Sequence, residues 1–333
     1  MPSLRALPLL LAAAMSVSAC SKADPGESKP TIAAAPEVSV KGIDTSTLTP
    51  RERREWAAEL TALLAPCPEV PVSLAQCIQE DRPCKSCLPA AKLLLKQVQA
   101  GKTQSEREAA FHARFDVNKV KQLPTDGAPE IGPPDAIVTI VEWADFECPF
   151  CRLVSPVLDD VVKRFPGQVR LLYKFYPLAG HAHGEIAARA AIAALNQGKF
   201  WEMHHMLFEN QEHLEQADLD RYARQIGLDL PKFRVDLTSK DVGDRIDKER
   251  KQADEVGLEG TPFIFINGRY VDFQLVTNPY EDLVDWVKLD IELAGKVPKI
   301  APSGSASAGA APKAPPAPTT SASAVPAAGK PGK

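Results

Sequence analysis

Residues 142–151, with the sequence EWADFECPFC, decide the fold of this chain. The β-branched run at residues 136–141 precedes them and has the composition of a buried central strand. Apolar residues at helical spacing follow them as far as Phe165. A C-x-x-C motif at such a strand-to-helix junction places its first thiol, Cys148, beside the unpaired N–H groups of the first helical turn, which stabilise a thiolate. The stretch therefore predicts a reactive cysteine pair.

A second motif, GTPFIFING, occupies residues 260–268. It opens with Thr261 and Pro262, continues as a short apolar strand and ends in an Asn-Gly pair typical of a tight hairpin turn. Together with the strand and the C-P-x-C helix, this motif resembles the thioredoxin fold in its DsbA-like branch of thiol:disulfide oxidoreductases. The resemblance covers roughly residues 126–296. It implies an α/β fold, and the helical patterns at residues 181–258 resemble the helical insertion of DsbA-like proteins.

The resemblance also implies the catalytic residues. Cys148 would be the exposed sulfur that attacks or is attacked, and Cys151 would be the less exposed thiol that resolves the mixed disulfide. Glu142 matches the family's buried acid, which would have a raised pKa and could take the proton of Cys151 through a water molecule. A purely structural carboxylate is the alternative for Glu142. No cofactor and no metal is expected.

Substrate contacts are expected around the same cysteine pair. In the family the peptide before the residue matching Pro262 is cis, which leaves its backbone open to strand-like pairing with an extended substrate. Four residues are predicted to contact the substrate: Pro149, Phe150, Thr261 and Pro262.

The N-terminal residues 1–20 predict export. Arg5 precedes an apolar run, residues 6–14, that is too short to span a bilayer. The run leads to VSAC at residues 17–20, which resembles a bacterial lipobox and implies a lipid on Cys20. An ordinary signal peptide is the alternative. Residues 21–45 have the composition of a flexible tether. We therefore expect a lipid-anchored protein at the periplasmic face of an envelope membrane.

Charge and cysteine content limit the class of partner. The net charge of −4, with mixed signs, gives no nucleic-acid footprint. Seven cysteines are many for a protein in a reducing compartment. The resemblance to DsbA-like oxidoreductases implies the partners, which are exported proteins with cysteines and a separate redox partner protein.

Residues 46–125, called the helical module below, carry helix patterns and four cysteines. Residues 82–87 and the helices after them resemble the small thiol subunits of cytochrome c maturation. Three hypotheses stay open: two structural disulfides, which the proline-rich surroundings favour, a second redox pair at Cys84 and Cys87, or a four-thiolate zinc site. The cysteines concerned are Cys67, Cys77, Cys84 and Cys87.

The sequence thus predicts five segments and two functional classes. The segments are a signal peptide (1–20), a tether (21–45), the helical module (46–125), a DsbA-like domain (126–298) and an Ala/Pro-rich tail (299–333). The favoured function is an envelope thiol:disulfide oxidoreductase. The alternative is a membrane-tethered binding or chaperone module on a thioredoxin fold. His181, His183, His204 and His205 are expected to pack or to cap helices, because neighbours on one helical turn do not face a common metal.

Overall fold

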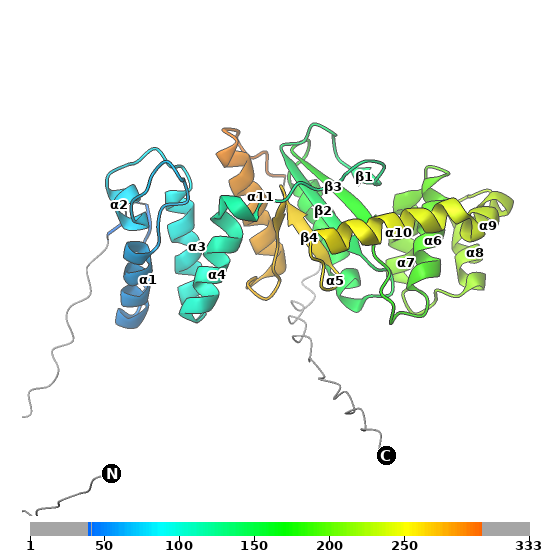
Figure 1. Cartoon of the computed structure of the whole chain (residues 1–333), viewed down its shortest axis with the longest axis horizontal. Coiled ribbons are helices and arrows are strands. Elements are labelled where there is room, and N and C mark those ends of the chain that lie inside the picture. The colour runs from blue at the N-terminus through cyan, green and yellow to red at the C-terminus, as the bar shows by residue number, and fades with distance from the viewer. Residues whose placement is uncertain (1–38, 41, 302–333) are drawn as a thin grey trace, which may run out of the picture. The chain divides into compact units, whose positions relative to one another are not determined.

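A five-stranded mixed sheet lies at the centre of the computed structural model, which describes residues 39–40 and 42–301 (Figure 1). The strand order is β1-β3-β2-β4-β5. Strand β2 is parallel to β3 and antiparallel to β4, and β1 and β5 run antiparallel to their neighbours at the edges. The strands are β1 (Glu130–Ile131), β2 (Val138–Ala144), β3 (Val169–Phe175), β4 (Phe263–Ile266) and β5 (Arg269–Tyr270).

Helices cover both faces of this sheet. On one face α5 and α11 bury an aliphatic cluster that includes Ile140, Leu158 and Leu283, and on the other face Ala253 of α10 packs near Trp143. Pro156 lies inside α5, as the sequence indicates. The helices concerned are α5 (Pro149–Arg164), α10 (Lys240–Glu255) and α11 (Pro279–Leu293).

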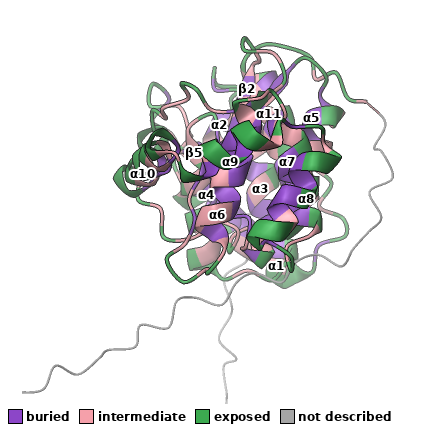
Figure 2. Ribbon diagram, turned by 90° about the vertical axis from the view of Figure 1, so that its right-hand side faces the viewer, coloured by how far each residue is buried: buried purple, intermediate pink, exposed green. Residues whose placement is uncertain are grey.

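The helices inserted between β3 and β4, α10 included, form a further hydrophobic cluster at one end of the sheet. Because α6 is rich in alanine, it packs closely against α7 and α9. The inserted helices direct their buried residues inward and their exposed residues outward (Figure 2). The predicted α/β fold with a helical insertion is confirmed. The inserted helices are α6 (Gly184–Leu195), α7 (Phe200–Glu209), α8 (Gln216–Gln225), α9 (Leu230–Thr238) and α10.

The hairpin between β4 and β5 turns at Asn267 and Gly268, as the Asn-Gly pair predicts. Both residues have positive φ, 47° and 77°. Only glycine fits at the second position, since an added Cβ would lie 2.3 Å from the Lys121 carbonyl oxygen.

Between residue 42 and the sheet, the described chain forms four helices and a single-turn 3₁₀ helix, η1 (Val117–Lys119). They enclose a core of their own in which the Trp56 indole donates a hydrogen bond to the Ala91 carbonyl at 2.9 Å. Thr49 and Thr103 form complete capping boxes, whereas Ser73 makes only the forward bond, to the N–H of Gln76. The helices are α1 (Pro50–Ala62), α2 (Leu74–Gln79), α3 (Cys87–Gln99) and α4 (Gln104–Phe115).

The helical module also contacts α11. Arg114 of α4 forms a buried ion pair with Asp290 of α11, and its guanidinium lies 4.7 Å from the centre of the Trp286 ring. The predicted tether does not extend to residue 45, because Val40 is buried in the core of the module. A domain boundary near residue 125 stays a prediction.

Two further predictions concern residues outside the described part of the chain. Cys20 and the signal sequence lie there, as does the tail beyond residue 301. Within the described residues, none of the helices combines the length and the apolar character that crossing a membrane requires.

Candidate active site

Cys148 occupies the N-cap position of α5, directly after the loop that leaves β2. Its N–H donates to the Asp145 carbonyl at 3.1 Å, and Pro149 begins the helix where no N–H partner is needed. Strand β2 is buried along almost its whole length, so the packed core holds the residue from which this loop begins. The cysteine thus lies at the helix N-terminus, as the sequence predicts.

The Thr261-Pro262 peptide is cis and faces this cysteine. The pairing of Trp143 with Phe263 brings the start of β4 beside the end of β2. As a result the Cys148 sulfur lies 3.4 Å from the Thr261 carbonyl oxygen, to which it donates a hydrogen bond when it is protonated. Residues that are 113 positions apart in the sequence therefore meet at the site.

Three of the four predicted substrate-contacting residues line one groove of about 1020 Å³. Phe150, Thr261 and Pro262 line it together with Ala109 and His112 of α4, whereas Pro149 is not among its lining residues. The helical module therefore contributes one wall of a groove beside the cysteine pair.

The prediction that Cys148 is exposed is wrong. Only 4% of the residue is accessible, against 0% for Cys151. Two contacts cover the residue. The Thr261 carbonyl oxygen lies against the sulfur, and the Gln211 side chain donates a hydrogen bond to the Cys148 carbonyl at 2.9 Å. The order of accessibility still follows the prediction, because Cys151 lies deeper.

The two thiols differ in acidity. A hydrogen bond with Cys151 is the largest influence on Cys148 and lowers its pKa to about 6, against the opposing effect of burial. Burial is the main cause that raises the pKa of Cys151 well above its usual value, followed by the hydrogen bond and the charge of Cys148. At neutral pH the first sulfur is therefore the thiolate and the second the protonated thiol.

Glu142 lies beneath this pair in a fully buried position. Burial raises its pKa to about 8, with smaller contributions from the charges of Asp159 and Cys148. Its Oε1 has no hydrogen-bond partner among the described residues. The charge of Glu142 in turn raises the pKa of Cys151, which shows that the two groups are electrostatically coupled. A neutral carboxyl at physiological pH fits a group that exchanges protons with a buried thiol.

Asp145 holds the active-site loop, a role that the sequence analysis missed. Its fully buried carboxylate accepts hydrogen bonds from the N–H groups of Glu147 and Leu178, both at 2.8 Å, and lies 2.6 Å from His181 Nδ1. Gly184 packs so closely that an added Cβ would lie 2.8 Å from the carboxylate. Asp145 and His181 are 36 positions apart, and neither stands in a motif that points to the other.

The other histidines also make local contacts. His183 Nε2 lies 3.0 Å from Glu215 Oε1, and His205 Nε2 lies 2.8 Å from Asp159 Oδ2. His204 is buried among aromatic rings, and burial lowers its pKa to about 3. His204 thus has the expected packing role, whereas His181, His183 and His205 contact carboxylates, which the sequence did not predict.

We expect the Asp145→Asn variant to lose about 2–4 kcal/mol of unfolding free energy. The amide N–H₂ of Asn is a donor, and it would replace a carboxylate oxygen that accepts a hydrogen bond from a buried N–H group. Chemical denaturation measures this loss. The matched control is Asp135→Asn, a change at an exposed loop position, which should stay within about 0.5 kcal/mol of the parent. Equal stability of the two variants would contradict the role assigned to Asp145.

The four cysteines of the helical module form two disulfides, Cys67–Cys84 and Cys77–Cys87, with Cα–Cα distances of 5.8 and 6.3 Å. The structure thereby supplies a pairing that the sequence left open. Neither bridge joins Cys84 to Cys87, although their spacing is C-x-x-C. A four-thiolate zinc site is at odds with these two bridges, since a sulfur in a disulfide is not a thiolate.

A family model, curated proteins and solved structures match parts of this chain. The family model described as thioredoxin matches residues 122–288, about half of the chain. A thioredoxin-like oxidoreductase from Silicibacter pomeroyi is 30% identical, with 50% of this chain and 94% of that protein covered and a TM-score of 0.45. BdbD from Bacillus subtilis is 22% identical, with 52% and 97% covered and a TM-score of 0.46.

Curated relatives include much longer proteins. The Na(+)/H(+) antiporter NhaA 3 of Salinispora tropica is 42% identical over 139 residues, which are 41% of this chain and 21% of the antiporter. The NhaA antiporter of Herminiimonas arsenicoxydans is 39% identical over 158 residues, 46% and 25% of the two chains. This chain thus spans about a fifth to a quarter of the length of these relatives.

The fold and the cysteine pair are those of a thioredoxin-fold protein. The chain belongs to the thioredoxin family, which confirms the resemblance that the two sequence motifs suggest.

Proposed function

We propose that this protein is an envelope enzyme that exchanges disulfides with exported proteins through Cys148 and Cys151. The observation that carries the proposal is the Cys148 thiol, whose pKa is lowered to about 6, placed 3.4 Å from the carbonyl oxygen of the cis Thr261-Pro262 peptide. This arrangement combines a nucleophile that is ionised at neutral pH with a backbone edge for an extended substrate.

In the oxidising direction a substrate thiolate attacks the sulfur of Cys148 in the Cys148–Cys151 disulfide. The S–S bond breaks, and its electron pair leaves on Cys151, which takes a proton from Glu142. A second substrate thiolate then attacks the substrate sulfur of the mixed disulfide and releases the Cys148 thiolate. The same steps reversed reduce a substrate disulfide, with Glu142 accepting the proton of Cys151. The reduction potential of the partner sets the direction.

The groove supports a protein substrate. It is about 1020 Å³ in volume, and its lining beside the thiol includes the apolar side chains of Phe150, Pro262 and Phe273. Such a surface also suits the alternative function, a binding or chaperone module. The two functions differ in whether they need the thiols.

The test is an assay of insulin reduction and of disulfide formation in a reduced two-cysteine peptide. We expect the parent protein to turn over repeatedly in at least one of these reactions, and the Cys148→Ser/Cys151→Ser variant to give no repeated turnover in either. Suppression of aggregation that is equal in both proteins, without catalysis by either, would favour the binding module and overturn the enzyme.

The proposed location rests on the lipobox at Cys20. A lipid on this residue, with a tether behind it, would hold the enzyme at the periplasmic face of a membrane. We expect the Cys20→Ala variant to leave the membrane fraction, whereas the parent stays in it. Identical fractionation of the two proteins would contradict the anchor.

A further inference from the structure

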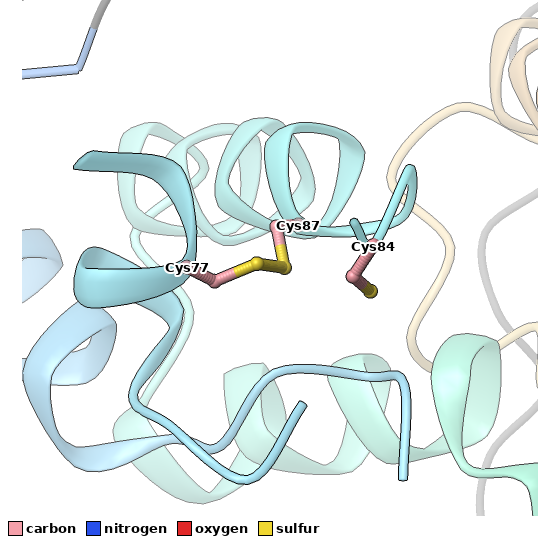
Figure 3. Close-up of side chains that lie close together, drawn as sticks. All are labelled: Cys77, Cys84 and Cys87. Atoms are coloured by element: carbon pink, nitrogen blue, oxygen red, sulfur yellow. A yellow bond between two sulfur atoms is a disulfide. The ribbon is translucent and has the colours of Figure 1, made fainter. Parts of the chain in front are cut away.

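The two disulfides of the helical module lie side by side. The sulfur atoms of Cys77, Cys84 and Cys87 are all within 4.8 Å of one another, although they belong to different bridges (Figure 3). Figure 3 shows the Cys84 sulfur beside the Cys77–Cys87 bond. Exchange between disulfides proceeds by attack of a thiolate on a neighbouring S–S bond, so this spacing is the first requirement for exchange.

The backbone also suits an alternative bridge between Cys84 and Cys87. The N–H of Cys87 donates to the Cys84 carbonyl at 3.2 Å and closes a four-residue turn. The end Cα atoms of such a turn are within about 7 Å, and a disulfide spans Cα atoms about 4.4–6.8 Å apart. Cys84 and Cys87 can therefore bond to each other with the local backbone close to its present course.

The position of Cys87 favours attack on its sulfur. Cys87 is the first residue of α3, and the side chain of the N-cap residue Ser86 makes no capping hydrogen bond. In the first turn the N–H groups of Cys87 and Ala90 donate to backbone carbonyls and Pro89 has no N–H, which leaves the N–H of Leu88 to stabilise negative charge that develops on nearby sulfur. Lys85 adds a cation two residues before the helix.

Cys67 supplies the entry point. The other three cysteines are buried, whereas Cys67 is partly exposed and lines a cleft of about 500 Å³. Arg114 and Arg269 line the same cleft. An incoming thiolate therefore meets the sulfur of Cys67 before any other sulfur of the module.

We propose that the helical module is a second thiol–disulfide exchange site, which oxidises a protein dithiol by way of an alternative Cys84–Cys87 disulfide. One thiolate of the dithiol attacks Cys67, the Cys67–Cys84 bond breaks, and Cys84 leaves as a thiolate. This thiolate attacks Cys87, forms Cys84–Cys87 and releases Cys77. The second thiolate of the dithiol then attacks the mixed disulfide and releases Cys67.

The electrons and protons balance. The dithiol loses two electrons and becomes a disulfide, and the module gains them as two thiols, Cys67 and Cys77. The two protons of the dithiol end on these sulfurs. One disulfide remains, but Cys84–Cys87 closes only a four-residue turn, so both native cross-links are open at the end of the exchange. The exchange requires neither Cys148 nor Cys151 and stands apart from the function proposed above.

The test uses the full chain with Cys148→Ser and Cys151→Ser, treated with one equivalent of dithiothreitol, alkylated and mapped by mass spectrometry. In molecules that have lost one disulfide we expect alkylated Cys67 and Cys77 and a Cys84–Cys87 linkage. Alkylation of Cys67 with Cys84, or of Cys77 with Cys87, would overturn the proposal. The proposal would also be overturned if dithiothreitol reduced neither disulfide while circular dichroism showed that the protein stays folded.

A matched variant removes the second bridge. With Cys77→Ser and Cys87→Ser added, Cys84 has no neighbouring disulfide to attack, so we expect Cys67 and Cys84 to be alkylated together and the Cys84–Cys87 product to be lost. If this variant does not fold, the mapping of the parent background decides alone. A module that only staples the fold would show alkylated Cys67 with Cys84, or Cys77 with Cys87, in the parent background as well, so the difference between the two proteins is what the proposal predicts.

Discussion

Replacing Cys148 with serine lowers the rate of thiol–disulfide exchange by about a thousandfold or more, because the hydroxyl group is not ionised at neutral pH and forms no disulfide. Replacing Cys151 with serine has a different result. The mixed disulfide between Cys148 and the substrate still forms, and it accumulates because the resolving sulfur is absent. The measurement is exchange with a cysteine-containing peptide, with the trapped adduct followed by mass spectrometry.

The two single variants are controls for one another, since each removes one thiol from the same helix. Their alkylation should differ as well. The remaining thiol of the Cys151→Ser variant should react readily at neutral pH, while that of the Cys148→Ser variant should react slowly, because Cys151 is fully buried. Equal alkylation of both thiols, or adducts on Cys151 in the parent, would reverse the assigned roles.

The second large effect concerns Glu142 and pH. The pKa of Glu142 is about 8 in the folded protein, against 4.5 as its ordinary value. Between these values the folded protein holds a proton that the unfolded chain has released, so the free energy of unfolding falls as pH rises from about 4.5 to 8. A shift of this size corresponds to roughly 4 kcal/mol over the interval.

The Glu142→Gln variant removes this titration. We expect its free energy of unfolding, relative to the parent, to increase by roughly 4 kcal/mol between pH 4.5 and pH 8.5. Denaturant titrations across this range measure the difference. Glu255→Gln is the control, because Glu255 is exposed at the end of α10 and should leave the pH dependence unchanged. A Glu142→Gln profile parallel to that of the parent would show that Glu142 is not protonated at neutral pH.

The sequence predicts those parts of the site that depend on local chemistry. Cys148 lies at a helix start because a buried strand precedes it and Pro149 follows it, and both features are visible in neighbouring residues. Thr261 and Pro262 could be placed opposite the cysteine only through the resemblance to a known fold. Asn267 and Gly268 turn as expected because the pair suits positive φ.

The parts that escape prediction depend on contacts between distant segments. Cys148 is buried because Thr261 and Gln211 lie against it, and no sequence pattern near residue 148 predicts these contacts. Asp145 and His181 meet across 36 residues, and each looks like an ordinary loop residue. The bridges of the helical module follow the packing of α2 against α3, which overrides the C-x-x-C spacing of Cys84 and Cys87.

The sequence separation between Cys148 and Thr261 also determines the order in which the cysteines and their contacts become available during synthesis. At about 5–20 residues per second, the 113 residues between Cys148 and Thr261 take roughly 6–20 seconds to synthesise. The two bridges ahead of them span only 17 and 10 residues, so all their cysteines are available before Cys148 has been added. In a chain that enters an oxidising compartment with its N-terminus first, this order exposes the four cysteines of the helical module to an oxidant before the active-site thiols arrive to compete for them.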